Sequence, residues 1–272
     1  MALTTFTNGT VADADEVNAN FQFVSSFGDG RDGAFSETAA STTNLTQGTV
    51  YQYSSFSLGV SHTISASTTS KYPMIIYVQG DCTINGTISL TGKGSPSSYT
   101  PLYGTVGANK STGKKGFATW NYLINQKTFT MNGTVGGVGG GRGSSGGGGA
   151  SVDNNGGGGG GVDTGSDGAI GAVGAGGCSL IIICGGDLTF GASSSIDVSG
   201  VDGGAGTTGD AGGSGGGGAG DILIFYNGSI TDNGVTTDVT GGAGGAASGI
   251  GTAGGAGGAG NVKIGAYNTI LW

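Results

Sequence analysis

The stretch GVDGGAGTTGDAGGSGGGG, residues 200–218, decides the fold that we expect for this chain. Glycine occupies every third position of this stretch, and proline is absent from it. A three-residue period is typical of an extended left-handed helix of the polyproline II type, which makes no hydrogen bonds within itself. Its backbone groups must pair with neighbouring helices, and a Cβ on a contacting face would keep those helices apart. The stretch therefore predicts a bundle of packed polyglycine II helices.

Collagen and flexible linkers are the alternative explanations of the glycine repeat. Collagen strands are stiffened by proline, whereas the three prolines of this chain lie outside the glycine tracts. Linkers have no reason to keep glycine in phase, yet the period recurs over 165–177 and over 242–260, where only Ser248 breaks it. The tracts 200–218 and 242–260 are equal in length. Each would span about 56 Å as one helix, at about 3.1 Å per residue, so we expect the two to lie side by side.

The tracts also differ in how strictly they need glycine. A helix inside a bundle touches neighbours on every face, whereas an outer helix touches them on some faces only. The run 156–161, which is all glycine, is therefore expected at an inner position. The sequence GTTGDAG at 206–212 is expected at an outer position.

Composition and charge exclude several classes of protein. The 272 residues include 66 glycines, and only 10% of them are charged, unlike an ordinary globular domain or a typical disordered chain. A net charge of −8 argues against nucleic acid or an anionic membrane as the main partner, because both need a basic patch. The start of the chain lacks the pattern of a secretory signal, and no apolar run is long enough for a membrane span. The three cysteines lie in strand-like stretches and are expected to be buried free thiols.

Apolar strands separate the glycine tracts and align with one another. The aligned stretches are MIIYVQGDCTI from Met74, LIIICGGDLTF from Leu180, ILIFYNGSIT from Ile222 and VKIGAYNTIL from Val262. The starts of the last three are nearly evenly spaced, while an insertion over 94–176 separates the first two. The first three units continue into a second short strand, and VYQYSSFSLGVSHTISAS adds strands before them. Stacking of such strand–turn–strand units predicts a β-solenoid, and Trp272 is a candidate cap for its end.

The best helix signal lies near the start of the chain, over 13–26. Acidic residues fall in its first turn, and Val17, Phe21 and Val24 share one face. So narrow an apolar stripe must pack on the body of the chain or on a partner, so these three residues are candidates for attachment or oligomerisation.

We therefore expect an all-β fold: β-solenoid-like repeats interleaved with packed polyglycine II helices, plus one short N-terminal α-helix. The expected regions are an N-terminal attachment segment over 1–35, a β-rich region with an aromatic and lysine-containing insertion over 36–132, and a glycine-rich repeat domain over 133–272.

Several motifs resemble chemical sites but have a simpler explanation. GRGSSG at 141–146 matches a dinucleotide-binding pattern by chance in so glycine-rich a chain, and ANKSTGKK at 108–115 departs from a phosphate-binding loop. GDGRDG at 28–33 could offer two aspartates to calcium, but a turn fits it better. His62 is the only histidine, so a metal cluster that needs several histidines is excluded. We expect no enzymatic activity, no metal and no cofactor.

Two parts of the sequence resemble bacteriophage virion proteins. TNGTVADADEVNANF at 7–21 resembles the N-terminal segment of many phage tail-fibre proteins, where it forms a short helix near an attachment region. The later tracts resemble the adhesins at the tips of T-even-like long tail fibres, in which polyglycine II helices form a sandwich and loops bind the host receptor. The regular apolar strands between the tracts depart from that pattern, and nothing here matches the fibre-binding domain of those adhesins.

The resemblance implies a structural protein of a phage tail fibre or spike that contacts the host surface. Its partners would be other virion proteins, through the N-terminal segment, and a host surface glycan or outer-membrane protein. We expect a homo-oligomer, with a trimer favoured, assembled in the host cytoplasm, carried on the virion, and without contact with nucleic acid or insertion into a membrane. The candidate receptor-contact residues lie in the insertion, where exposed aromatic rings suit sugars and protein loops: Tyr99, Tyr103, Trp120, Tyr122, Phe129, Lys114 and Lys115.

Each element of this interpretation has an alternative. The aromatic residues of the insertion could instead form a small satellite core beneath a long loop. The protein could be a purely architectural virion subunit, or one that forms filaments by stacking end to end, because sheets with open edges favour such growth. A bacterial surface adhesin is a third possibility, weakened by the missing secretory signal.

Overall fold

The computed structural model describes residues 15, 17–18, 26–70, 72–94, 119–124, 127–132, 174–207, 212–249 and 253–267. The regular structure of these residues is almost entirely β, in strands β1 to β17. Helical backbone among them occurs at Asp15, Val17, Asn18, Ser26 and Phe27. These positions fall in or directly after the predicted N-terminal helix; Phe21 and Val24 lie outside the described residues.

Three parallel sheets of five strands make up most of the fold. Sheet A runs β1-β4-β7-β12-β15 (Ala34–Glu37, Ser55–Leu58, Cys82–Ile84, Leu188–Phe190, Ile230–Asp232). Sheet B runs β2-β5-β8-β13-β16 (Thr42–Leu45, Thr63–Ala66, Thr87–Ser89, Ser195–Asp197, Thr236–Asp238). Sheet C runs β3-β6-β11-β14-β17 (Val50–Tyr53, Met74–Val78, Leu180–Cys184, Ile222–Tyr226, Val262–Ala266).

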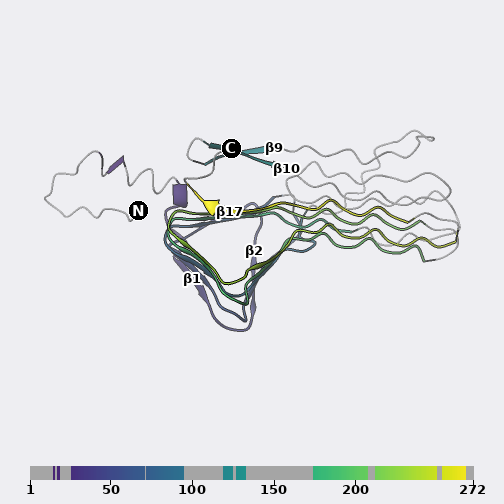
Figure 1. The fold of residues 1–272 in the computed structure, drawn as a ribbon, viewed down its shortest axis with the longest axis horizontal. Helices are drawn as coiled ribbons and strands as arrows, with labels where there is room; N and C mark the ends of the chain where they lie inside the picture. Colours follow the sequence, from purple (N-terminus) through teal and green to yellow (C-terminus); the bar gives the residue numbers. More distant parts are fainter. Residues whose placement is uncertain are drawn as a thin grey trace.

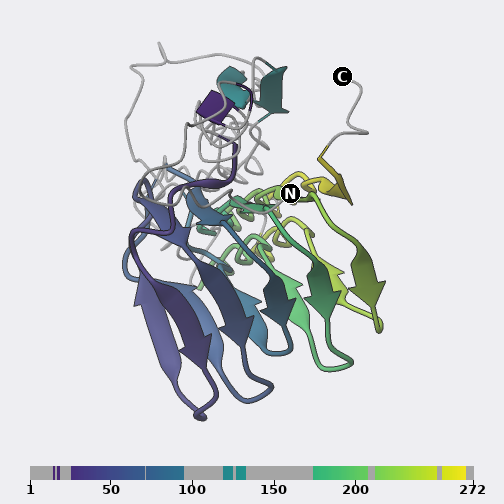
Figure 2. The same ribbon diagram turned by 90° about the vertical axis from the view of Figure 1, so that its left-hand side faces the viewer.

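The three sheets form a solenoid-like repeat. Along the chain these strands enter sheets A, B and C in rotation, so each turn adds one strand to every sheet. Seen end on, the sheets are the three sides of a triangle (Figure 1). Turned by 90°, the strands lie one beside the next along the stack (Figure 2).

The strand register confirms the alignment predicted from the sequence. Leu180 pairs with Met74 on one side and with Ile222 on the other, and Ile222 pairs with Val262. The predicted unit of two strands was wrong, because the chain bends near Gly80 and divides the first aligned stretch into β6 and β7. Each unit therefore has three strands. Every sheet joins strands from the predicted 36–132 region to strands from the predicted 133–272 domain.

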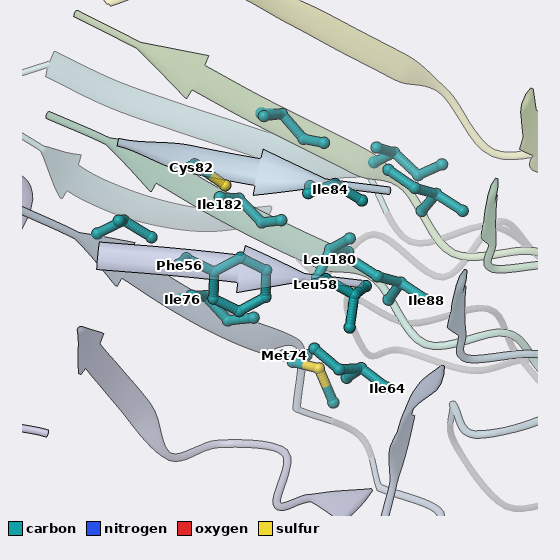
Figure 3. Close-up of a cluster of buried hydrophobic side chains, with 14 of the residues drawn as sticks. Phe56, Leu58, Ile64, Met74, Ile76, Cys82, Ile84, Ile88, Leu180 and Ile182 are labelled. Atoms are coloured by element: carbon teal, nitrogen blue, oxygen red, sulfur yellow. The ribbon is translucent and has the colours of Figure 1, made fainter. Parts of the chain in front are cut away.

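The space between the sheets is filled by side chains in register. Ile76, Ile182 and Ile224 are paired neighbours in sheet C, and all three are buried. Phe56 and Leu58 of sheet A extend into the same core, together with Ile64 and Ile88 of sheet B (Figure 3). Full burial of each such side chain stabilises the fold by about 1.5–3 kcal/mol. The continuous apolar runs of sheet C therefore follow from burial on both faces, because its outer face is covered as well.

Glycine segments extend away from the corner between sheets B and C (Figure 1); together we call them the glycine arm. Within 198–220 the chain folds back on itself, since the N–H of Gly217 donates to Val201 (2.9 Å) and that of Ser214 to Gly204 (3.0 Å). In 239–260 the same reversal joins Gly257 to Gly242 and Gly254 to Gly245. The prediction that each tract forms one long rod was therefore wrong. Each tract is a pair of antiparallel segments, 198–204 with 214–220 and 242–245 with 254–257, joined by backbone hydrogen bonds.

Hydrogen bonds between the segments follow a three-residue period. The N–H groups of Gly200, Gly203 and Gly206 donate to the carbonyls of Thr240, Ala243 and Ala246. Segment 212–220 is buried throughout and bonds to four others, which contain residues 174–177, 198–204, 242–245 and 255–258. A single segment thus exchanges backbone hydrogen bonds with neighbours in several directions, which a β-strand does not do.

Glycine is required where the segments touch. A Cβ on Gly217 would collide with the carbonyl oxygen of Ala175, and one on Gly216 with that of Gly242. The outermost segment is instead AGGAGGAG at 253–260, and its alanines Ala253, Ala256 and Ala259 are exposed. In this segment, therefore, alanine occupies the solvent-facing positions, and glycine occupies the positions that contact other segments.

Of the two glycine stretches whose positions were predicted, 206–212 is described in part and 156–161 is not described. GTTGDAG, expected at an outer position, is described at three residues only: Gly206 bonds to Ala246, Thr207 is exposed and Gly212 is buried, while 208–211 lie outside the described residues. The run 156–161, expected at an inner position, lies outside them as well.

Replacing Gly217 with alanine should destabilise the protein by about 1–3 kcal/mol or more, because the new methyl group must displace packed backbone. Gly265→Ala is the matched control, since a Cβ at Gly265 has no atom within 4 Å. Thermal unfolding measures both variants. Equal melting temperatures for the two would contradict the close packing of the arm.

A buried carboxylate lies at the base of the arm. Asp221 directly precedes β14 and accepts hydrogen bonds from the backbone N–H (2.8 Å) and the side-chain amide (3.2 Å) of Asn261, which precedes β17. Its own N–H donates to the hydroxyl of Ser179, which precedes β11 (3.0 Å). Burial raises the pKa of Asp221, and the N–H of Asn261 opposes this rise only in part.

The raised pKa predicts a pH-dependent effect of Asp221→Asn. The folded state binds this proton more tightly than the unfolded state, so the wild-type protein loses stability as pH rises from the usual aspartate pKa, about 3.9, through the folded value. The amide keeps an oxygen for the N–H of Asn261 and does not titrate. The free energy of unfolding, measured with denaturant, should therefore be higher for the variant relative to wild type at pH 7 than at pH 3. A difference that does not change with pH would refute this assignment.

Candidate functional site

The antiparallel hairpin of β9 (Thr119–Ile124) and β10 (Lys127–Asn132) holds three of the predicted contact residues. Tyr122 lies opposite Phe129, and Trp120 lies opposite Met131. Opposed residues, and residues two apart, occupy the same face of an antiparallel pair. The register therefore gives Trp120, Tyr122 and Phe129 positions on one face of the hairpin. The other predicted contact residues, Tyr99, Tyr103, Lys114 and Lys115, lie outside the described residues.

The described end of the N-terminal segment packs on the body of the chain. Phe27 is 5% exposed and joins an apolar cluster on the outer face of sheet C with Ile75, Ile181, Ile183 and Phe225. Its ring also contacts Tyr267, which follows β17, at a centroid distance of 5.0 Å. Of the predicted attachment residues, Val17 is half-buried. Of the two ways in which the segment could pack, the structure therefore supports packing on the body of the chain for its end at Ser26 and Phe27.

GDGRDG is a turn whose carboxylates are used locally. Asp29 pairs with the guanidinium of Arg31 at 2.9 Å, and the hydrogen bond from that guanidinium lowers the pKa of Asp29. Asp32 accepts the backbone N–H of Gln52 at 2.7 Å. Gly28, Gly30 and Gly33 have φ values of +69° to +83°, which side chains rarely adopt. The turn predicted from the sequence is therefore confirmed.

The single histidine and the cysteines are part of the packed core. The ring of His62 is buried, within hydrogen-bond distance of the hydroxyls of Ser41 (3.1 Å) and Thr43 (2.9 Å) and of the carbonyl of Ala39 (3.0 Å). All three cysteines are buried free thiols, as predicted. A hydrogen bond with Cys184, together with burial, raises the pKa of Cys82 well above its usual value. A protonated, buried thiol is unreactive.

The outer face of sheet B carries polar side chains that the sequence analysis did not single out. Two rows cross the five strands in register. The first row is Thr42, Thr63, Thr87, Ser195 and Thr236. The second row is Asn44, Ser65, Ser89, Asp197 and Asp238. The signal was present in the sequence, because Thr-Ile-Ser occurs at both 63–65 and 87–89.

No family model, curated protein or solved structure matches this chain. The described residues contain no group of three or more histidine, cysteine, aspartate or glutamate side chains that could hold a metal ion. Among the same residues, no helix is both long and apolar enough to cross a membrane.

Shortening Phe27 to alanine should release the N-terminal segment from sheet C. The change removes a ring from a buried cluster and should cost about 3–5 kcal/mol. Faster proteolytic cleavage N-terminal to residue 27 would show the release. Asn18→Ala, at an exposed position of the same segment, is the control. Cleavage at the wild-type rate in the Phe27 variant would show that this contact does not anchor the segment.

Proposed function

We propose that the protein is a structural component of a bacteriophage tail fibre or spike, assembled in the host cytoplasm, that contacts the host cell surface. The phage-like sequence at 7–21 supports the virion role and an attachment role for the N-terminal segment. A stack of paired sheets that carries a long insertion between β8 and β11 also suits a fibre tip. We propose a homo-oligomer, most simply a trimer, on the virion.

We further propose that the stack is a β-solenoid and that the glycine arm is a bundle of polyglycine II helices. Donation at every third residue matches the three-residue turn of that helix. Hydrogen bonding to several neighbours at once, and the exclusion of Cβ atoms at the contacts, support the same assignment. Such an arm would be held by its backbone hydrogen bonds, and it would depend on the absence of a Cβ at the contacts.

The hairpin β9–β10 is the proposed point of host contact. The observation that carries this proposal is the register, in which Tyr122 opposes Phe129 and Trp120 lies two positions from Tyr122. Aromatic rings on one face of a ribbon suit the apolar faces of sugars and protein loops. Lys114 and Lys115 precede the hairpin in the sequence and would add positive charge to the contact.

In the last described turn, two polar positions favour a discrete tip over an end-to-end filament, whereas the exposed Ile230, in register with the buried Leu188, would favour stacking. Asp232 of β15 pairs with Phe190 of the previous turn, and Thr237 of β16 pairs with Ile196. Phe190 and Ile196 are buried, whereas Asp232 and Thr237 are exposed. The carboxylate of Asp232 accepts the N–H groups of Gly234 and Val235. Inward-directed polar residues at an edge oppose the addition of another strand layer.

The test of host contact is adsorption by particles that carry Trp120→Ala and Tyr122→Ala. Removal of two aromatic rings from a binding face should lower the adsorption rate at least about tenfold, since such residues each contribute about 2 kcal/mol or more. The control is Asn121→Ala with Thr130→Ala, an opposed pair at positions of the other face. Unchanged adsorption in the aromatic variant would reject the hairpin as the contact.

A further inference from the structure

The outer face of sheet B is a two-dimensional polar array. Its two rows of five contain hydroxyl, amide and carboxylate groups, with no lysine, arginine, aliphatic or aromatic residue. Neighbouring strands lie about 4.8 Å apart, and residues two apart on a strand lie about 6.7 Å apart. The array therefore presents polar groups at two fixed spacings on a rigid surface.

Many of these groups are available to a ligand. Within the described part of the chain, the hydroxyls of Thr42, Thr63, Thr87 and Ser195 make no hydrogen bond to protein. In the second row, Ser65 donates to the carbonyl of Ser89 (2.9 Å), which fixes the side chain but leaves its oxygen free to accept. Thr63, Ser65, Thr87 and Ser89, in the middle of the two rows, are half-buried.

We infer that this array binds a neutral, hydroxyl-rich polysaccharide whose chain runs across the strands, along the stack. Sugar hydroxyls both donate and accept, as do the side chains of the array. Charge supports this ligand, because the carboxylates of Asp197 and Asp238 repel acidic polymers and the two rows contain no cation to pair with phosphate. The inference rests on the proposed host-surface role and assigns its glycan partner to a second surface, separate in sequence from the hairpin.

The array repeats with each turn of the stack, and this repetition explains how it could bind a polymer tightly without aromatic rings. A single sugar hydrogen-bonded to a flat face competes with water and is held weakly. A polymer that offers similar hydroxyls at each sugar can engage successive turns, and each further contact is intramolecular. Ordered water is the competing occupant of such an array. The two carboxylates make the second row uneven in the last two turns, which suits a sugar polymer better than a uniform lattice of ice.

Affinity electrophoresis of the full-length protein tests the inference, with dextran, mannan and galactan as neutral probes and alginate as the acidic one. The wild-type protein should be retarded by at least one neutral polymer and not by alginate. Thr63→Val with Thr87→Val keeps the shape and β-propensity of the face but removes two hydroxyls, and should weaken retardation about tenfold. The control is Thr83→Val with Thr189→Val, the same change at paired positions on sheet A.

A second measurement needs no variant. Oligosaccharides of the retarding polymer should compete better as they lengthen, until the chain spans the five turns. The inference is overturned if none of the neutral polymers retards the protein, if retardation survives the Thr63 and Thr87 changes, or if competition does not depend on length. It is also overturned if these threonines instead control the inhibition of ice-crystal growth.

The hairpin and the array are separable in these tests. Trp120→Ala with Tyr122→Ala should leave retardation by polysaccharide unchanged, because the array does not include them. Normal adsorption of that variant, together with retardation that depends on Thr63 and Thr87, would reject the hairpin contact and keep the array. If that variant loses adsorption and no neutral polymer retards the wild-type protein, the hairpin contact is kept and the array is rejected.

Discussion

The fold of the described residues depends on backbone hydrogen bonds between neighbouring turns of the chain. In the sheets, each strand pairs with strands of the turns before and after it, and the side chains stack in columns. In the glycine arm the same turn-to-turn bonding continues without side chains, because contacts such as that between Gly217 and Ala175 leave no room for a Cβ. The sheets and the arm therefore share one repeat, set by the nearly even spacing of Leu180, Ile222 and Val262 along the chain.

The parts of the fold that the sequence could predict are those with a period. The apolar stretches from Met74, Leu180, Ile222 and Val262 align in the sequence as they do in space, because buried positions in a parallel stack demand the same residue type in each turn. The need for glycine at the contacts in the arm followed from the same reasoning. The period is broken at Ser248, inside the reversal of the second tract, but it continues without a break through the reversal of the first.

The errors concern bends and reversals, which leave weaker signals. The bend near Gly80 divides one apolar stretch into two strands, whereas Gly-Asp there predicts only a turn within a larger unit. The reversal inside 198–220 lies within an unbroken glycine period, so nothing in that period marks it. Among the candidate site residues, the pairing of Tyr122 with Phe129 required the hairpin register. The two rows of sheet B could be recognised only from the strand pairing, because the paired residues Ser195 and Thr236 lie in different local sequences.

The insertion between β8 and β11 has a consequence for how such a chain can vary. Ser89 and Leu180 are far apart in sequence, yet Met74 pairs directly with Leu180 and Cys82 with Leu188, as if the turns were consecutive. The entropy cost of closing a loop rises only slowly with its length. The corner after β8 is therefore a point where the length and sequence of the insertion could change while the pairing of the sheets stays the same.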